Sequence, residues 1–311
     1  MKICVVGAGA LGCSIGGVLT EAGEEVWLIT RNKAHVDAMN REGLKMRDGD
    51  QVRTVAVKAA TSCAGLEPMD LIIVLAKSYD TRSAIEAAAP AIGPNTQILS
   101  LQNGLGHEEI LAEIVGRERL LAGKTYVGGV MTAPGCITIG TSGKQTIIGE
   151  LDGAISDRVQ KVASHFNRAG LDTRVSDNII GTIWDKLLIN VATGALAGIS
   201  GLPYGHLYAV PEIEAAALDA VAEAMTVAQA NGIALSIATP RQAWEMASAS
   251  LPFEFKTSML QSLERGAKTE IDFINGSVVR WGERCNVPTP VNRTLVACVK
   301  GIETRQRHGV Q

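Results

Sequence analysis

The chain has 311 residues, is 46% hydrophobic and carries a net charge of −3, so it can bury the cores of about two domains of ordinary size. This composition excludes a disordered or collagen-like chain. The weak negative charge, the 4% aromatic content and the lack of a long basic tract argue against a nucleic-acid-binding protein. The six cysteines have neither CxxC pairing nor zinc-ligand spacing, which predicts reduced thiols, no metal site and a cytoplasmic protein.

The N-terminal segment over residues 3–20 contains no charged side chain and could mimic a signal peptide or a membrane span. Five glycines interrupt it and hardly any basic residue precedes it, which argues against both interpretations. We expect instead a strand over 3–6, a glycine-rich turn, a helix that stops at Gly23 and a second strand over 25–30. This order of elements is the context that a dinucleotide-binding fingerprint requires.

The fingerprint itself reads GAGALG, residues 7–12. Gly7 allows the tight turn, Gly9 lets the backbone approach a pyrophosphate, and Gly12 lets helix and strand pack closely. The alternative is a glycine-rich turn in some other α/β protein. The residues that we expect to contact the cofactor are Gly7, Gly9, Ala10, Leu11 and Gly12.

The segment after the second strand, Thr30-Arg31-Asn32-Lys33, distinguishes between the two nicotinamide cofactors. An NAD site usually has Asp or Glu here to hold the ribose 2′-hydroxyl, whereas this segment has two cations and no acid. A guanidinium can bind a 2′-phosphate bidentately and stack on adenine. We therefore predict NADP(H) as the cofactor with Arg31 at the 2′-phosphate, while Lys33 fits a solvated residue at the start of the next helix.

Strand-like and helical segments then alternate, which predicts a parallel, doubly wound sheet. Ligands of such sheets bind beyond the carboxyl ends of the strands. Lys77 and Asn103 end two predicted strands, so both are cofactor-binding candidates, although Lys77 could equally open a surface turn and Asn103-Gly104 is also a plain turn signal. The predicted strands are 70–77 and 96–103, and the predicted helices are 33–43, 80–90 and 106–116.

The pattern changes over residues 124–150, where we expect hairpins that extend the sheet, before a helix over 157–170 and a last strand over 171–176. Almost no strand signal follows. We therefore predict two domains, a cofactor-binding domain over 1–177 and a helical domain over 178–311, with a ligand pocket in the cleft between them. The predicted helices of the second domain are 178–198, 211–232, 239–250, 255–265, 267–285 and 291–307.

The stretch WDKLLINVATGAL, residues 184–196, sets polar positions into an apolar helix. At about 100° per residue, Lys186, Asn190 and Gly194 share one stripe. Buried lysine is rare without a partner, and an unpaired buried amide is costly. The stripe therefore faces either a polar pocket or, in the alternative interpretation, a solvated edge with Asp185 beside it.

A second group of polar residues lies in KTSMLQSLERGAKTEIDFINGSVV, residues 256–279. Ser258 opens one predicted helix, and Glu270 lies near the start of another. A carboxylate near a helix start often serves as a cap or complements the helix dipole. The functional alternative pairs Glu270 with Lys186, whose amine needs a counter-charge if it is desolvated.

Together these residues resemble the ketopantoate reductase family (2-dehydropantoate 2-reductases), and the resemblance spans nearly the whole chain. The block over 257–279 is its most specific part, because GxGxxG is shared with many dehydrogenases. The resemblance implies a Rossmann-type domain followed by an all-helical domain of the 6-phosphogluconate dehydrogenase C-terminal type. The matching segments are GAGALG, Arg31, LAKSYDT, QNGLG, WDKLLIN, TSMLQSLERGAKTEIDFINGSVV and NVPTPVNRTL.

The resemblance also implies a reaction, in which reduced nicotinamide delivers a hydride to the C2 carbonyl of a 2-oxo acid. Lys186 is then the general acid that protonates the developing alkoxide, and Glu270 supports Lys186 and the cofactor ribose. A cationic donor in a dry cleft stabilises the charge that develops on the carbonyl oxygen more than it stabilises the ground state.

The binding residues follow from the same resemblance. It places Asn103 near the nicotinamide, and Arg31 and Lys77 at the 2′-phosphate end of NADPH. It places Asn190 and Ser258 at the substrate, with Ser258 near the carboxylate.

Two positions depart from the family pattern, because Gly194 and Tyr204 stand where the family has asparagines that contact the hydroxyl side of the substrate. A site built to bond a hydroxyl discriminates strongly for it, so losing both amides puts the preference for ketopantoate in doubt. We expect Gly194 to open room in the pocket and Tyr204 to line it with a ring.

Three functions remain open on this basis. The first is reduction of ketopantoate to (R)-pantoate for pantothenate and coenzyme A synthesis, and the second is a D-2-hydroxyacid dehydrogenase acting on a branched or aromatic 2-oxo acid. The third is a catalytically idle NADP-binding sensor, against which the Lys186 and Glu270 pair argues. The only partner that we expect besides the small substrate is a second copy in a homodimer, because residues 212–229 are apolar enough for either a core or an interface. Neither nucleic acid nor a membrane is expected.

Overall fold

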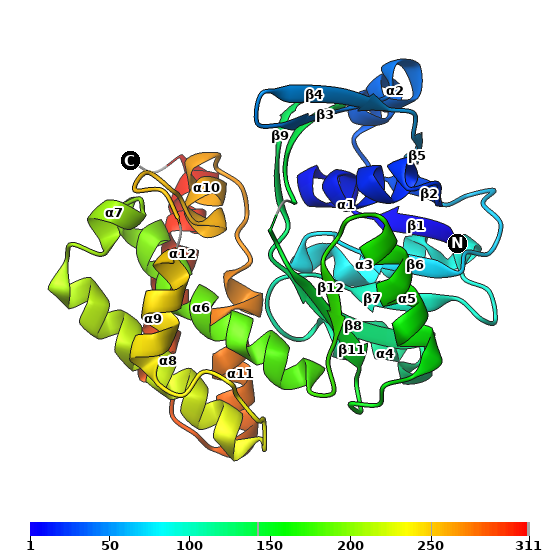
Figure 1. Ribbon diagram of the computed structural model, residues 1–311. Coiled ribbons are helices and arrows are strands. Elements are labelled where there is room, and N and C mark those ends of the chain that lie inside the picture. Colours follow the sequence, from blue (N-terminus) through cyan, green and yellow to red (C-terminus); the bar gives the residue numbers. More distant parts are fainter. Residues whose placement is uncertain (142, 250, 310–311) are drawn as a thin grey trace. The chain divides into compact units, whose positions relative to one another are not determined.

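The computed structural model describes residues 1–141, 143–249 and 251–309, and the chain divides into two compact units (Figure 1). The sheet unit comprises Met1–Gln102 and His107–Ile179. The helical unit comprises Asn103–Gly106 and Ile180–Gln311. The division thus falls two residues after the boundary expected from the sequence, and the short loop over 103–106 groups with the helical unit.

The sheet unit is built on an eight-stranded sheet in the order β12-β11-β8-β7-β6-β1-β2-β5. All neighbouring strands are parallel except β8 and β11, which pair antiparallel. The predicted α/β class is therefore confirmed. The strands are β1 Lys2–Val6, β2 Glu25–Ile29, β5 Lys58–Ala60, β6 Leu71–Val74, β7 Gln97–Ser100, β8 Leu120–Thr125, β11 Thr146–Glu150 and β12 Thr173–Val175.

Helices cover both faces of this sheet because successive residues of a strand point to opposite sides. In β1, Val5 packs in one buried cluster with side chains of α1 and α5, whereas Val6 packs in another with side chains of α3 and α4. From Ile3 to Val6 this strand is apolar and buried, as expected for a strand covered on both faces. The helices are α1 Ala10–Glu21, α2 Lys33–Glu42, α3 Thr81–Ala87, α4 His107–Val115 and α5 Asp157–Arg168.

A second, four-stranded sheet in the order β4-β3-β10-β9 was not predicted. The expectation that all hairpins over 124–150 extend the main sheet is wrong for β9 and β10, although β11 does join that sheet. The second sheet packs on α1, where glycines allow a close approach: a Cβ on Gly17 would lie 2.5 Å from Met46 Sδ. The strands are β3 Leu44–Asp48, β4 Gln51–Val55, β9 Gly128–Ala133 and β10 Cys136–Gly140.

The regular elements that the structure describes after residue 178 are all helical, as predicted. The predicted helix over 267–285 is shorter than expected, because a 3₁₀ turn, Ile271–Phe273, precedes α11. The apolar side of α8, the helix that contains residues 212–229, is buried. The helices are α6 Ile179–Ser200, α7 Tyr204–Leu207, α8 Pro211–Ala230, α9 Pro240–Ser248, α10 Ser258–Glu264, α11 Asn275–Cys285 and α12 Pro290–His308.

Helix α6 is the central helix of this unit, and none of its residues from 179 to 198 is exposed. Trp184 packs edge-on against Trp281 of α11, with ring centroids 5.7 Å apart. Among the described helices, α6 alone is long and apolar enough to cross a membrane by length and composition, but 67% of its apolar window is buried inside the structure. A core helix meets the same criterion, so its composition reflects packing within the unit.

Candidate active-site residues

The glycine loop has the geometry that a bound pyrophosphate requires. Gly7 has a φ of +99°, and a Cβ on it would lie 2.3 Å from Ala76 N. A Cβ on Gly12 would lie 2.5 Å from Gly7 O, whereas a Cβ on Gly9 would meet no atom within 4 Å. Helix α1 then begins at Ala10 without a side-chain cap. The loop therefore leaves open space in front of an uncapped helix N-terminus, which fits the diphosphate of a dinucleotide.

Arg31 follows β2 as predicted, and its side chain is 82% exposed. It is not alone, because its Nη2 donates to Asp80 Oδ2 at 2.6 Å. The acid that the sequence lacks after β2 is thus supplied from the turn after β6. Lys33 is the first residue of α2 and pairs with Asp37 at 2.7 Å on the same helix, which agrees with its interpretation as a solvated residue.

Lys77 is exposed at the start of the turn that joins β6 to α3. Buried Gln102, two residues after β7, fixes this turn: its Nε2 donates to Ala76 O and to Thr81 Oγ1, both at 2.8 Å. Thr81 Oγ1 donates in turn to Ser78 O at 2.8 Å. The backbone that carries Lys77 is therefore anchored to the neighbouring strand.

The loop that carries Asn103 is bound to the 3₁₀ turn after Glu270. Leu105 N donates to Phe273 O at 2.9 Å. Gly104 has a φ of +101°, and a Cβ on it would lie 2.3 Å from the same oxygen. Asn103-Gly104 is thus more than a local turn signal, because the glycine lets this loop join the segment that begins at Glu270.

The stripe on α6 is half-buried rather than solvated. Lys186 and Asn190 are partly covered, and every other residue from 183 to 198 is at least partly buried as well. Asp185 is only 7% exposed, so the alternative of a solvated edge with Asp185 beside it is wrong. Its carboxylate accepts hydrogen bonds from Ser236 Oγ at 2.6 Å, Ser236 N at 3.0 Å and Ile237 N at 3.1 Å. Asp185 therefore ties the loop before α9 to α6, one residue from the proposed general acid.

Gly194, one turn after Asn190, is buried against α10. A Cβ on Gly194 would lie 3.6 Å from Met259 Cε, and one on Gly198 would lie 3.0 Å from Leu263 Cδ1. Gly198 lets α10 pack closely on α6, whereas a Cβ on Gly194 would make only an ordinary contact. The space beside Gly194 is thus bordered by an apolar side chain where the family pattern has an amide.

Tyr204 is the first residue of α7 and only 7% of it is exposed. Its hydroxyl lies 3.1 Å from Thr193 Oγ1 on α6, and burial raises its pKa. The ring stacks on Tyr208 and meets Phe255 edge-on, and Tyr208 stacks in turn on Trp244. A cluster of aromatic rings thus lies next to the α6 stripe, one turn beyond Asn190.

Ser258 and Glu270 lie at helix starts, as predicted, but neither side chain caps its helix. Thr257 caps α10, because its Oγ1 accepts from Leu260 N at 3.1 Å, and Ser258 is exposed beside it. Glu270 occupies the N-cap position of the 3₁₀ turn, yet its side chain makes no capping hydrogen bond. The half-buried Glu270 carboxylate is therefore not explained as a cap.

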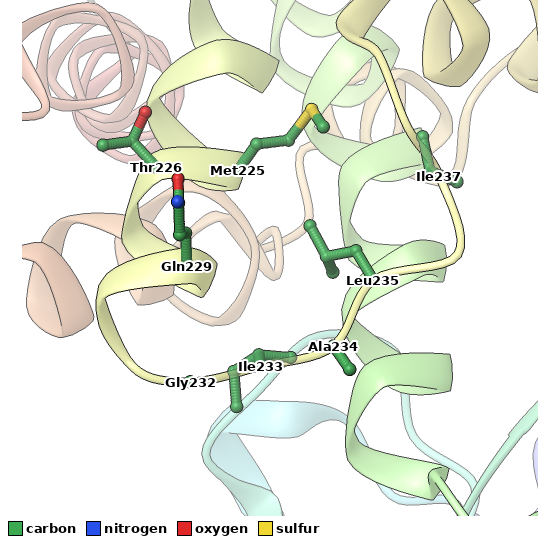
Figure 2. A pocket seen from close by; sticks show the side chains of 8 residues that line it. All are labelled: Met225, Thr226, Gln229, Gly232, Ile233, Ala234, Leu235 and Ile237. Atoms are coloured by element: carbon green, nitrogen blue, oxygen red, sulfur yellow. The ribbon is translucent and has the colours of Figure 1, made fainter.

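Two hollows are lined by none of the predicted site residues. One, of about 370 Å³, lies in the helical unit between the end of α8 and the loop that follows (Figure 2). The other, of about 450 Å³, lies in the sheet unit between α3 and α4. Within the described ranges, no group of three His, Cys, Asp or Glu side chains could hold a metal ion. The residues that line the first hollow are Met225, Thr226, Gln229, Gly232, Ile233, Ala234, Leu235 and Ile237.

A parallel sheet whose first strand leads into this glycine turn is the architecture of enzymes that bind nicotinamide dinucleotides, and the chain is an oxidoreductase of that class. Its sequence narrows the class. The family profile described as "Ketopantoate reductase PanE/ApbA" matches residues 3–153, and its C-terminal counterpart matches residues 178–303. The chain belongs to the ketopantoate reductase family.

Relatives and solved structures agree with this assignment. A 2-dehydropantoate 2-reductase of Pyrococcus horikoshii is 38% identical over 98% of both chains. The crystal structure of a PanE/ApbA family ketopantoate reductase from Ralstonia eutropha JMP134 has a TM-score of 0.91 at 35% identity, covering 99% of this chain and 100% of that one. A ternary structure of D-mandelate dehydrogenase with NADH and anilino(oxo)acetate has a TM-score of 0.92 at 27% identity, with coverage of 99% and 100%.

Proposed function

We propose that the chain is a 2-dehydropantoate 2-reductase, which uses NADPH to reduce ketopantoate to (R)-pantoate for pantothenate synthesis. The observation that carries this proposal is the α6 stripe, where a half-buried lysine and amide stand four residues apart in a core helix. Buried amines are rarely kept for packing alone. The helical unit also contains Asn103, Ser258 and Glu270.

The bound reduced nicotinamide supplies a hydride to the C2 carbonyl carbon of the 2-oxo acid. Lys186 donates a proton to the carbonyl oxygen as that oxygen gains negative charge, so each turnover consumes one proton and one reduced cofactor. The Lys186 cation stabilises the negatively charged oxygen of the transition state more than the neutral carbonyl of the ground state. Its partly buried position on α6 strengthens this effect, because less water screens the charge. Glu270 supports the lysine and the cofactor ribose.

The remaining residues bind and orient. Asn190 and Ser258 hold the substrate, with Ser258 at its carboxylate, and Asn103 lies at the nicotinamide. Arg31 and Lys77 hold the 2′-phosphate end of NADPH, and the GAGALG backbone holds the pyrophosphate. A cytoplasmic location and a homodimer remain predictions from the sequence.

A second candidate function, reduction of a branched or aromatic 2-oxo acid, is favoured by the surroundings of Gly194 and Tyr204. Met259 and a stacked aromatic cluster stand where the family pattern has two amides. An apolar pocket discriminates only weakly between substrates that differ by a small group. A pocket that lacks a hydrogen-bonding group no longer selects for a substrate that carries a hydroxyl. The likeness to D-mandelate dehydrogenase supports the same direction.

The test follows the loss of reduced nicotinamide absorbance with NADPH and a panel of acids: ketopantoate, a branched 2-oxo acid and an aromatic one. Turnover of ketopantoate well above the others supports the first function, and the reverse order supports the second. No turnover of any acid would leave only a cofactor-binding sensor.

A variant separates catalysis from binding. Lys186→Ala should lose roughly a hundredfold or more in kcat, the usual contribution of a positioned general acid, while the Kd for NADPH changes little. Lys161→Ala, at an exposed position of α5, is the matched control and should behave as wild type. Wild-type turnover by Lys186→Ala would show that another group donates the proton.

A further inference from the structure

The ion pair between Arg31 and Asp80 lies where the adenosine end of a dinucleotide is expected. Arg31 follows β2 and Asp80 follows β6, and these two strands flank β1, which leads into the glycine loop. In sheets of this kind an acid after the second strand holds the ribose 2′-hydroxyl of NAD. The Asp80 carboxylate reaches the guanidinium at that position from a different element.

The fold directs this carboxylate toward Arg31. Asp80 occupies the N-cap position of α3, where aspartate normally accepts a hydrogen bond from the first helical turn, but its side chain makes no such bond. It accepts from Arg31 Nη2 at 2.6 Å instead. The turn that carries Asp80 is fixed by two hydrogen bonds, which Gln102 Nε2 donates to Ala76 O and Thr81 Oγ1. Only a quarter of the Asp80 side chain is exposed, whereas Arg31 is largely exposed. The acid is therefore the anchored member of the pair.

We propose that Asp80 sets the cofactor preference of this chain by weakening NADPH binding relative to NADH, so that both cofactors are used. The inference rests on the proposed function, because it assumes that Arg31 lies at the 2′ position. A 2′-phosphate carries close to two negative charges, so a carboxylate that pairs with its guanidinium both competes for the cation and repels the phosphate. A ribose 2′-hydroxyl, by contrast, can donate to the same carboxylate.

The experiment measures binding by isothermal titration at an ionic strength of about 0.15 M, where exposed charges more than about 8 Å apart are largely screened from one another. The titrants are NADPH, NADH, adenosine 2′,5′-bisphosphate and 5′-AMP, added to the full chain. Asp80→Asn should lower the Kd for NADPH and for the bisphosphate by roughly tenfold and should leave NADH unchanged or weaker. Asp80→Ser also removes the carboxylate and keeps a good N-cap residue, so it should shift the preference in the same direction even if the asparagine variant folds poorly.

The matched control is Asp37→Asn, which removes an aspartate that pairs with an exposed lysine at 2.7 Å on α2. It should change every Kd by less than about twofold, because long-range effects of one surface charge are small. Weaker NADPH binding by Asp80→Asn would overturn the proposal, since Asp80 would then orient Arg31 for the phosphate. Equal changes for NADPH and NADH, or none, would overturn it too. A wild-type chain that binds neither nucleotide would refute the proposed function instead.

Discussion

Gly194 is the position at which the structure gives the sharpest prediction about the α6 stripe. Replacing a glycine inside a helix by alanine stabilises the helix by about 0.5–1 kcal/mol, because it restricts the unfolded chain. A Cβ on Gly194 would lie 3.6 Å from Met259 Cε, an ordinary contact, with no other heavy atom of the surroundings within 4 Å. Gly194→Ala should therefore keep this gain and raise Tm by roughly 1–3 °C.

Gly198 offers the matched control on the same helix. Its Cβ would lie 3.0 Å from Leu263 Cδ1 and 3.5 Å from Met259 Cγ, so Leu263 has to give way by a few tenths of an ångström. Overpacking of this kind costs about 1–3 kcal/mol, which offsets the gain in the helix. Gly198→Ala should be less stable than Gly194→Ala by about 1 kcal/mol or more in thermal or urea unfolding.

The same pair of variants reports on the substrate site. If the space beside Gly194 receives the substrate side chain, Gly194→Ala should raise KM for the bulkier 2-oxo acids while the protein becomes more stable. Any change of KM in Gly198→Ala should instead come with a loss of stability, because a Cβ on Gly198 meets side chains of α10. A Gly194→Ala protein that unfolds at a lower temperature than Gly198→Ala would refute the packing argument. An unchanged KM for every acid would place the substrate elsewhere.

Two further predictions concern charged side chains that the structure buries. Asp185→Ala leaves Ser236 N and Ile237 N without their acceptor and should cost about 3 kcal/mol or more in unfolding free energy. Asp185→Asn keeps one acceptor oxygen and should cost less. Equal losses of stability in the two variants would contradict this account. Burial raises the pKa of Glu24, but hydrogen bonds from His165, the terminal amine and Arg168 outweigh that effect and lower the pKa from 4.5 to about 2. This lowering of the Glu24 pKa corresponds to about 3 kcal/mol, a contribution present above pH 4.5 and lost as pH falls toward 2. Glu24→Gln should therefore be less stable than wild type by up to about 3 kcal/mol at neutral pH. The difference between the two proteins in unfolding free energy, measured with urea, should become smaller below about pH 4.5. A difference that does not depend on pH would contradict the assignment.

Most of the main sheet and the helical unit could be predicted from the sequence, because their signals are local. GAGALG directly follows a short apolar strand, and the structure places it in the turn after β1 and the first turn of α1. The periodic apolar residues predicted both ends of α6 and both ends of α8 to within two residues. The half-buried state of Lys186 and Asn190 also follows from such periodicity, since a stripe four residues apart keeps one face of a helix.

The second sheet could not be predicted as a whole, because its central pairing is not local. A hairpin signal did exist: Gly49-Asp50 lies between alternating segments that become β3 and β4. The pairing of β3 with β10, however, joins Met46 to Ile137 in parallel across the chain. No pattern within either segment specifies that partner. In the sequence, the glycines of α1 that allow the second sheet to pack closely cannot be distinguished from the glycines of the GAGALG fingerprint.

Asp80 and Met259 were missed for the same physical reason, and both alter how the site is understood. Asp80 belongs to a motif that the sequence offered for Lys77, but its partner Arg31 is 49 residues away. Met259 directly follows Ser258, yet its place beside Gly194 depends on how closely α10 packs on α6. One helix therefore carries both the proposed carboxylate ligand and an apolar side chain in place of the missing amide. Because an apolar side chain cannot replace a hydrogen bond to a substrate hydroxyl, the approach of α10, rather than the absence of a side chain at Gly194, should decide which 2-oxo acid is preferred.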